Sequence, residues 1–242
     1  MKIINPSVQL EDEIDGQAIL KKIERIGRVC YKSEGNITED SAERFVKNIM
    51  NRNHESVLEH VSISVRVICD RGVSHEIVRH RIASYSQEST RYNNYSKDKF
   101  GNELTFIKPC WFKSNLQDLN NYANNKNNFK KIYSAGEWAW VDSLRGIEIN
   151  YFTLLECCNW TPEQARSILP NSLKTEIVMT MNLREWRHFF LLRCDKAAHP
   201  QMREVAYLIV DLLNQNIPII FEDIAEKYLK KESQNIKKVF TK

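Results

Sequence analysis

The sequence predicts a mixed α/β protein, because helical and strand periodicities both occur along the chain. Within residues 14–29, apolar side chains such as Ile19, Ile23 and Ile26 recur at the spacing of one helix face. Residues 61–69 alternate apolar and mostly polar side chains, which is the period of a half-buried strand. No repeat is visible, and 242 residues with 42% hydrophobic content predict a single domain, 1–242.

Local signals place the next elements. A second helix is expected over 40–50, followed by the 61–69 strand. Ser74 is a suitable N-cap for a third helix, which would carry Arg79, His80 and Arg81 near its C-terminal end. After Ala83 the helical pattern stops, so residues 87–91 are expected to be extended.

The second half of the chain is predicted to be mainly helical. An Asn-rich stretch indicates a surface excursion near 113–130, and a long helix is expected over 129–158. Thr161, Pro162 and Gln164 form a capping-box pattern for a short helix. A strand over 173–181 leads to a helix capped by Asn182, and Pro200 opens a last helix through Leu213.

Composition favours a cytoplasmic protein. The net charge of +4 is too small to require nucleic acid or a membrane as partner. The first residues show no signal-peptide pattern, and no apolar run reaches the roughly 18 residues that span a bilayer. The six cysteines contain no C-x-x-C pair and are expected to be mostly buried thiols.

The segment from Arg79 to Tyr92 is the strongest candidate for a site, because it holds three arginines, one histidine and several hydroxyls. Arginine is the side chain suited to bidentate recognition of phosphate. On a helix, Arg79, His80 and Arg81 would diverge by about 100° each. In the extended part, Gln87, Ser89 and Arg91 would share one side, which suits a nucleobase and a phosphate.

Other chemistries are disfavoured. The histidines lack the spacing of a zinc site, so no metal is expected. No G-x-G-x-x-G motif follows a strand, so a Rossmann dinucleotide site is not supported. A nucleophilic serine needs a paired base, and nothing in the sequence pairs Ser89 with His80. Ser89 is therefore expected to bind substrate.

The motifs resemble those of the flavin-dependent thymidylate synthase family. Arg79-His80-Arg81, seven residues, then Ser89 and Arg91-Tyr92 match its signature. The blocks at 54–60, 165–170 and 181–193 agree in order and spacing. The resemblance implies a central antiparallel-type sheet flanked by long helices, and a homotetramer with active sites at subunit interfaces.

The resemblance also implies a reaction. It is the reductive methylation of dUMP to dTMP, with 5,10-methylenetetrahydrofolate as methylene donor. FAD is the cofactor, reduced by NADPH, and the folate leaves as tetrahydrofolate.

Carried over by position, the resemblance assigns two sets of ligands. The set expected to bind FAD comprises His54, Ser56, Arg79, His80, Arg81, Ile82, Asn182, Arg184 and His188. The set expected to bind dUMP comprises Glu76, Gln87, Ser89, Thr90, Arg91, Arg166 and Arg193. Of these, Arg193, Arg91 and Ser89 are expected to act in catalysis, with Arg193 stabilising negative charge on a pyrimidine oxygen.

A non-enzymatic nucleotide-binding or nucleic-acid-binding protein is the alternative. The arginine-rich segment, with Tyr85, Tyr92 and Tyr95, could contact a backbone and stack on bases. Against this alternative, the basic residues do not form one long stripe.

Overall fold

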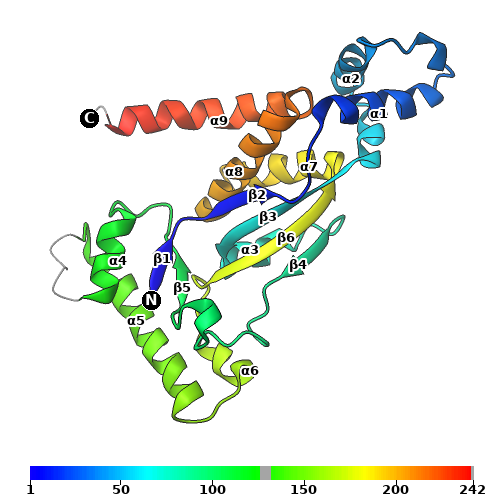
Figure 1. The fold of residues 1–242 in the computed structure, drawn as a ribbon. Helices are drawn as coiled ribbons and strands as arrows, with labels where there is room; N and C mark the ends of the chain where they lie inside the picture. The colour runs from blue at the N-terminus through cyan, green and yellow to red at the C-terminus, as the bar shows by residue number, and fades with distance from the viewer. Residues whose placement is uncertain (126–131, 241–242) are drawn as a thin grey trace. The chain divides into compact units, whose positions relative to one another are not determined.

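The computed structural model describes the backbone of residues 1–125 and 132–240 and confirms a mixed α/β fold (Figure 1). The strands are β1 (Lys2–Ile4), β2 (Ser7–Leu10), β3 (Ser62–Asp70), β4 (Ser84–Gln87), β5 (Thr105–Ile107) and β6 (Lys174–Asn182). The helices are α1 (Gly16–Val29), α2 (Ser41–Asn51), α3 (Arg71–Ile77), α4 (Leu116–Asn124), α5 (Ala135–Glu156), α6 (Pro162–Ala165), α7 (Leu183–Arg193), α8 (Pro200–Asn216) and α9 (Pro218–Phe240). Short 3-10 turns are η1 (Glu34–Asn36), η2 (Glu55–His60), η3 (Asp98–Phe100) and η5 (Arg166–Ile168).

The described strands form two sheets. In the smaller sheet β1 and β5 pair in parallel, with Ile3 beside Phe106. The larger sheet has the order β2-β3-β6-β4. The antiparallel arrangement expected for this central sheet stays a prediction.

The chain divides into two compact units. Unit 1 comprises Met1–Ser7, Ile68–Arg79 and Ser86–Ile177. Unit 2 comprises Val8–Val67, His80–Tyr85 and Val178–Lys242. The residues expected to bind FAD fall in unit 2 except Arg79, and those expected to bind dUMP fall in unit 1 except Arg193.

Unit 1 has a core formed by β1, β5 and the helices α4 and α5, with Phe106, Tyr122 and Tyr151 fully buried. Asn120 of α4 ties this helix to β1, because its side chain accepts a hydrogen bond from Ile3 N at 2.8 Å and donates one to Ile3 O at 2.9 Å. The backbone N–H and C=O of Ile3 thereby have hydrogen-bond partners inside the unit.

Unit 2 is built around α7. Trp186 is fully buried and donates from its indole nitrogen to the carbonyl of Ile63 in β3 at 3.1 Å. Phe190 stacks on Trp186, and Phe221 of α9 packs edge-on against Phe190. This aromatic cluster holds α7 against β3 and α9.

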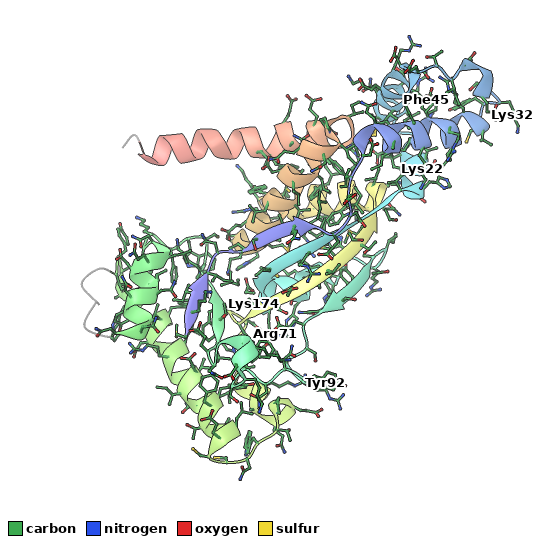
Figure 2. The ribbon with its side chains drawn as sticks, in the orientation of Figure 1. Lys22, Lys32, Phe45, Arg71, Tyr92 and Lys174 are labelled. Atoms are coloured by element: carbon green, nitrogen blue, oxygen red, sulfur yellow. The ribbon has the colours of Figure 1, made fainter. Side chains whose placement is uncertain are left out.

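The helices α1 and α2 of unit 2 approach closely at a glycine. A Cβ placed on Gly27 would lie 2.8 Å from the Phe45 ring, whose position on α2 is labelled in Figure 2. The Arg28 guanidinium lies 4.9 Å from the centre of the same ring. The absence of a side chain at position 27 therefore permits this contact.

Several local predictions are confirmed. The strand expected over 61–69 is β3, and the strand expected over 173–181 is β6. The Thr161 hydroxyl accepts from Gln164 N, and the Gln164 side chain accepts from Thr161 N, which completes the capping box of α6. Asn182 caps α7, with Oδ1 accepting from Glu185 N at 2.8 Å.

The position of the third helix was predicted wrongly. The N-cap of α3 is Asp70, whose carboxylate accepts from Val73 N at 2.9 Å. Ser74 instead lies inside the helix and donates to Arg71 O. Because the helix starts earlier, it also ends earlier, at Ile77, and the Arg79-His80-Arg81 run follows it.

The prediction for the following segment also needs correction. Residues 84–87 form β4, and Thr90–Tyr92 is a turn in which Asn93 N donates to Ser89 O at 3.1 Å. The strand therefore ends at Gln87, and residues 87–91 do not form one extended segment that presents one side.

The Asn-rich stretch, expected to be a loop, contains the helix α4. Asn115 caps this helix by accepting from Asp118 N, and Asn120 is fixed by β1 as described above. Residues 126–131, where the loop was expected to end and the long helix to begin, lie outside the described residues. The described part of that long helix is α5, and α9 was not anticipated. Among the described residues, no helix is long and apolar enough to cross a membrane.

Candidate active site

A cavity of about 530 Å³ lies in unit 2 beside the N-terminal part of α7. Its lining comprises Glu55, Glu59, Ile82, Asn182, Arg184, Glu185, Arg187, His188 and Leu191. Three separate segments meet there: η2, the loop before β4, and α7. Four residues expected to bind FAD, namely Ile82, Asn182, Arg184 and His188, therefore share one cavity.

Two arginines of this cavity form three ion pairs. Arg184 Nη1 lies 2.5 Å from Glu59 Oε1, and both side chains are about half exposed. Arg187 is buried and pairs with Glu55 at 3.0 Å and Asp223 at 2.8 Å. Arg187 thus anchors η2 and α9 to α7, whereas Arg184 keeps contact with solvent and remains able to exchange partners.

The side chain of His80 is buried against α7 and does not line the cavity. Its Nε2 accepts a hydrogen bond from Arg193 Nε at 3.0 Å. Its ring packs edge-on against Phe189, with 4.8 Å between centroids. Burial, together with the positive charges of Arg193 and His188, lowers the pKa of His80 to about 4. The imidazole is therefore neutral at neutral pH.

The remaining residues expected to bind FAD are exposed. His54 caps η2, and its Nδ1 lies 3.4 Å from the Tyr31 hydroxyl. Ser56 lies within η2. Arg79 and Arg81 flank His80 in the sequence, and both are exposed at the surface. These four residues do not line the cavity.

In unit 1, Gln87 is fixed by two hydroxyls. Its Nε2 lies 2.9 Å from Ser74 Oγ and 3.1 Å from Thr175 Oγ1. Glu76 lies in the same helix as Ser74 and is partly buried. The structure thus connects Gln87 to α3 and β6.

Glu88 anchors the segment after Gln87. Its carboxylate accepts from the Tyr95 hydroxyl at 2.9 Å and from Lys174 Nζ at 2.9 Å; Lys174 is labelled in Figure 2. The next residues turn: Ser89 Oγ accepts from Arg91 N at 3.2 Å, and Thr90 is buried. Glu88 therefore fixes the start of the turn that presents Arg91.

Arg91 meets α6 in unit 1. Its Nε lies 2.8 Å from Glu163 Oε1, with both side chains about half exposed. Arg166 follows Glu163 by three residues and is exposed at the end of the same short helix. The structure thereby brings Arg91 to the helix that ends at Arg166.

Sequence reasoning missed the carboxylates. Glu55, Glu59 and Glu185 all line the cavity, yet none was chosen as a candidate. The i, i+4 spacing of Glu55 and Glu59 within the 54–60 block was the available signal. For Glu185, only its place at the third position of a capped helix was visible.

The fold and this cavity define an α/β protein with a cavity of charged and apolar side chains beside the helix α7. The family model described as thymidylate synthase complementing protein matches residues 14–219. The chain belongs to this family, which confirms the family expected from the sequence and its class of enzyme, the flavin-dependent thymidylate synthases.

Relatives agree with this assignment. The flavin-dependent thymidylate synthase of Geobacter sulfurreducens is 32% identical over 203 residues, covering 81% of this chain and 78% of the relative. That of Pyrococcus furiosus is 36% identical over 187 residues, covering 76% and 68%. The solved structure of Thymidylate Synthase X from Helicobacter pylori with FAD and dUMP has a similar fold, with a TM-score of 0.67 at 21% identity. It covers 90% of this chain and 98% of that one.

Proposed function

We propose that this chain methylates dUMP reductively to dTMP, with 5,10-methylenetetrahydrofolate as methylene donor and FAD reduced by NADPH. The observation that carries the proposal is the cavity shared by Ile82, Asn182, Arg184 and His188. The proposal includes one catalytic domain, 1–242, and a cytoplasmic location. The family assignment favours the enzyme over a non-enzymatic binding protein.

The residues of the cavity fit part of a dinucleotide such as FAD. Its volume of about 530 Å³ lies within the roughly 300–1,000 Å³ of ligand pockets. Arg184 and His188 can donate to phosphate or ring oxygens, and Glu59 can accept from hydroxyl or amino groups. Leu191 and Ile82 add apolar surface. When bound, FAD reduced by NADPH supplies the hydride that completes the methyl group.

In unit 1, the substrate residues would act by positioning. Arg91 and Arg166 are suited to the phosphate or the pyrimidine carbonyls of dUMP, because guanidinium groups bind such oxygens in pairs. Gln87, Ser89, Thr90 and Glu76 would provide hydrogen bonds. The Ser89 hydroxyl accepts from Arg91 N, which holds Ser89 in the turn beside Arg91.

Arg193 would act as an electrophilic catalyst, which stabilises negative charge on the substrate. Uracil C5 becomes nucleophilic only when negative charge builds up on the ring oxygens, and a guanidinium aimed at one of them stabilises that charge. Loss of one comparable donor costs roughly 3–4 kcal/mol of barrier. No enzyme nucleophile is required by this scheme.

The proposal includes a homotetramer with active sites at subunit interfaces. Its support in unit 2 is apolar surface: Ile82 is 67% exposed, and Leu191 and Leu192 are about half exposed. Sedimentation of the purified protein should give four times the 28.5 kDa chain mass. A monomer at the concentrations used for assay would contradict this part.

The nucleic-acid alternative loses support from the aromatic residues. Tyr95 is buried, and its hydroxyl is bound to Glu88. The Tyr85 hydroxyl donates to His80 O at 2.7 Å. Of the three tyrosines that could stack on bases, only Tyr92 is largely exposed, and Figure 2 shows it at the surface.

FAD titration tests the proposal. The purified protein should bind FAD and turn yellow, and Arg184→Ala and His188→Ala should weaken this binding. Cys110→Ala, an exposed change in unit 1, serves as the matched control. A protein that stays colourless with excess FAD would contradict the proposed function.

A further inference from the structure

Glu185, Phe189 and Arg193 form one stripe on α7. They are spaced four residues apart, which on a helix places them on the same face over about 12 Å of axis. The ring of His80 lies on this stripe. Phe189 packs against it edge-on at 4.8 Å between centroids.

The two ring nitrogens of His80 face the two ends of the stripe. Nε2 lies 3.0 Å from Arg193 Nε, and Nδ1 lies 3.4 Å from Glu185 Oε1. Both His80 and Glu185 are buried. A third contact fixes the backbone, because the Tyr85 hydroxyl donates to His80 O.

Hydrogen-bond chemistry permits one protonation state of this group. Arginine Nε carries a hydrogen and no lone pair, so it can only donate. His80 Nε2 must therefore accept, which means that it carries no hydrogen. A neutral imidazole keeps its hydrogen on the other nitrogen, so the hydrogen is on Nδ1, which lies 3.4 Å from Glu185 Oε1.

We propose that Glu185 is a positioning residue that holds His80 in the Nδ1–H tautomer and thereby fixes the direction of the Arg193 guanidinium. The catalytic consequence rests on the proposed function, in which Arg193 stabilises charge on the pyrimidine. A doubly protonated His80 would place two N–H groups against each other and release Arg193. The lowered pKa of His80, caused by burial and by the charges of Arg193 and His188, agrees with this geometry.

The tautomer is measured directly by nitrogen-15 spectra of protein labelled only in histidine. His80→Gln assigns the two ring signals. At pH 7 we expect Nδ1 protonated and Nε2 unprotonated. An Nε2–H tautomer or a doubly protonated ring overturns the proposal. The spectrum needs neither flavin nor nucleotide, so it tests the pair even if the protein has no thymidylate synthase activity.

Two substitutions test the role of the carboxylate. Glu185→Gln keeps an oxygen that can accept from Nδ1–H, so the tautomer and most of kcat should be retained. Glu185→Leu leaves Nδ1–H without an acceptor, so we expect mixed tautomers and a kcat lowered about 10-fold or more, by analogy with other carboxylates that hold an imidazole tautomer. All assays are made at saturating FAD.

Glu59→Leu is the matched control, because it removes another carboxylate from the same cavity without touching His80. It should leave the His80 spectrum unchanged. A Glu185→Leu protein with wild-type kcat overturns the positioning role. An equal loss of kcat in the Glu185→Gln and Glu185→Leu variants also overturns it. The loss would then not depend on whether residue 185 can accept a hydrogen bond.

Discussion

Arg91 and Glu163 form an ion pair in unit 1, with 2.8 Å between Nε and Oε1. The guanidinium also lies 5.4 Å from the centre of the Tyr92 ring. If Arg91 binds the anion of dUMP, then Glu163 competes with the substrate for it. The pair therefore holds Arg91 in place at the expense of some affinity.

Glu163→Gln should therefore lower the KM for dUMP. A half-exposed ion pair contributes up to about 1 kcal/mol, so the decrease should reach about 5-fold at most. Arg91→Ala should abolish dUMP-dependent oxidation of reduced flavin while FAD stays bound. Steady-state kinetics at low salt measures both, with Glu156→Gln, an exposed change at the end of α5, as control. A raised KM in Glu163→Gln would show that the pair assists binding.

The two arginines of the cavity should differ in their effect on stability. Arg187→Ala removes a buried guanidinium that pairs with Glu55 and Asp223, which should cost about 3 kcal/mol of unfolding free energy. Arg184→Ala breaks a half-exposed pair with Glu59, which should cost much less because solvent screens such a pair. Denaturant unfolding of the FAD-free proteins measures both. Equal losses would contradict the larger contribution expected of the buried Arg187 network.

Acid should destabilise the protein through His80. Burial and the charges of Arg193 and His188 lower its pKa from 6.5 to about 4 in the folded state. Between these values the unfolded chain binds a proton that the folded chain does not. The contribution of neutral His80 to the free energy of unfolding is therefore complete above pH 6.5. It is lost as the pH falls toward 4, by about 3 kcal/mol at most.

Unfolding in denaturant at a series of pH values checks this dependence. The wild-type free energy of unfolding should fall between pH 6.5 and 4, and His80→Gln should show a shallower slope. Identical slopes for the two proteins would place the acid sensitivity elsewhere.

The thiols should be dispensable for catalysis. Burial raises the pKa of Cys194 to about 12 and also raises that of Cys69, so both stay protonated. The other four cysteines are exposed, contrary to the expectation of mostly buried thiols. Cys157→Ala and Cys158→Ala should keep kcat near the wild-type value. A complete loss in either variant would reopen thiol catalysis.

Local chemistry could be predicted from the sequence, and competition between nearby signals could not. The capping box at Thr161 and the cap at Asn182 depend on residues three apart, so both were found. For α3, Ser74 was expected to be the cap, but Asp70, the last residue of β3, takes this role. The Asn-rich stretch became a helix partly because Asn120 is held by β1, 117 residues away in the sequence.

Which residues bind the ligands stays a prediction, and the contacts among the candidate residues could not be predicted from the sequence. The motif gave Ile82, Asn182, Arg184 and His188, which do share a cavity. It could not give the pairs of Arg91 with Glu163 or of His80 with Arg193, because these join residues 72 and 113 positions apart. Periodicity carries no information about such distant partners.

The products of a complete reaction test the central claim most directly. Purified protein is supplied with FAD, NADPH, dUMP and 5,10-methylenetetrahydrofolate, and the nucleotide and folate products are separated by chromatography. The account predicts dTMP together with tetrahydrofolate, both absent when FAD is omitted. No dTMP, or dTMP accompanied by dihydrofolate, would contradict it.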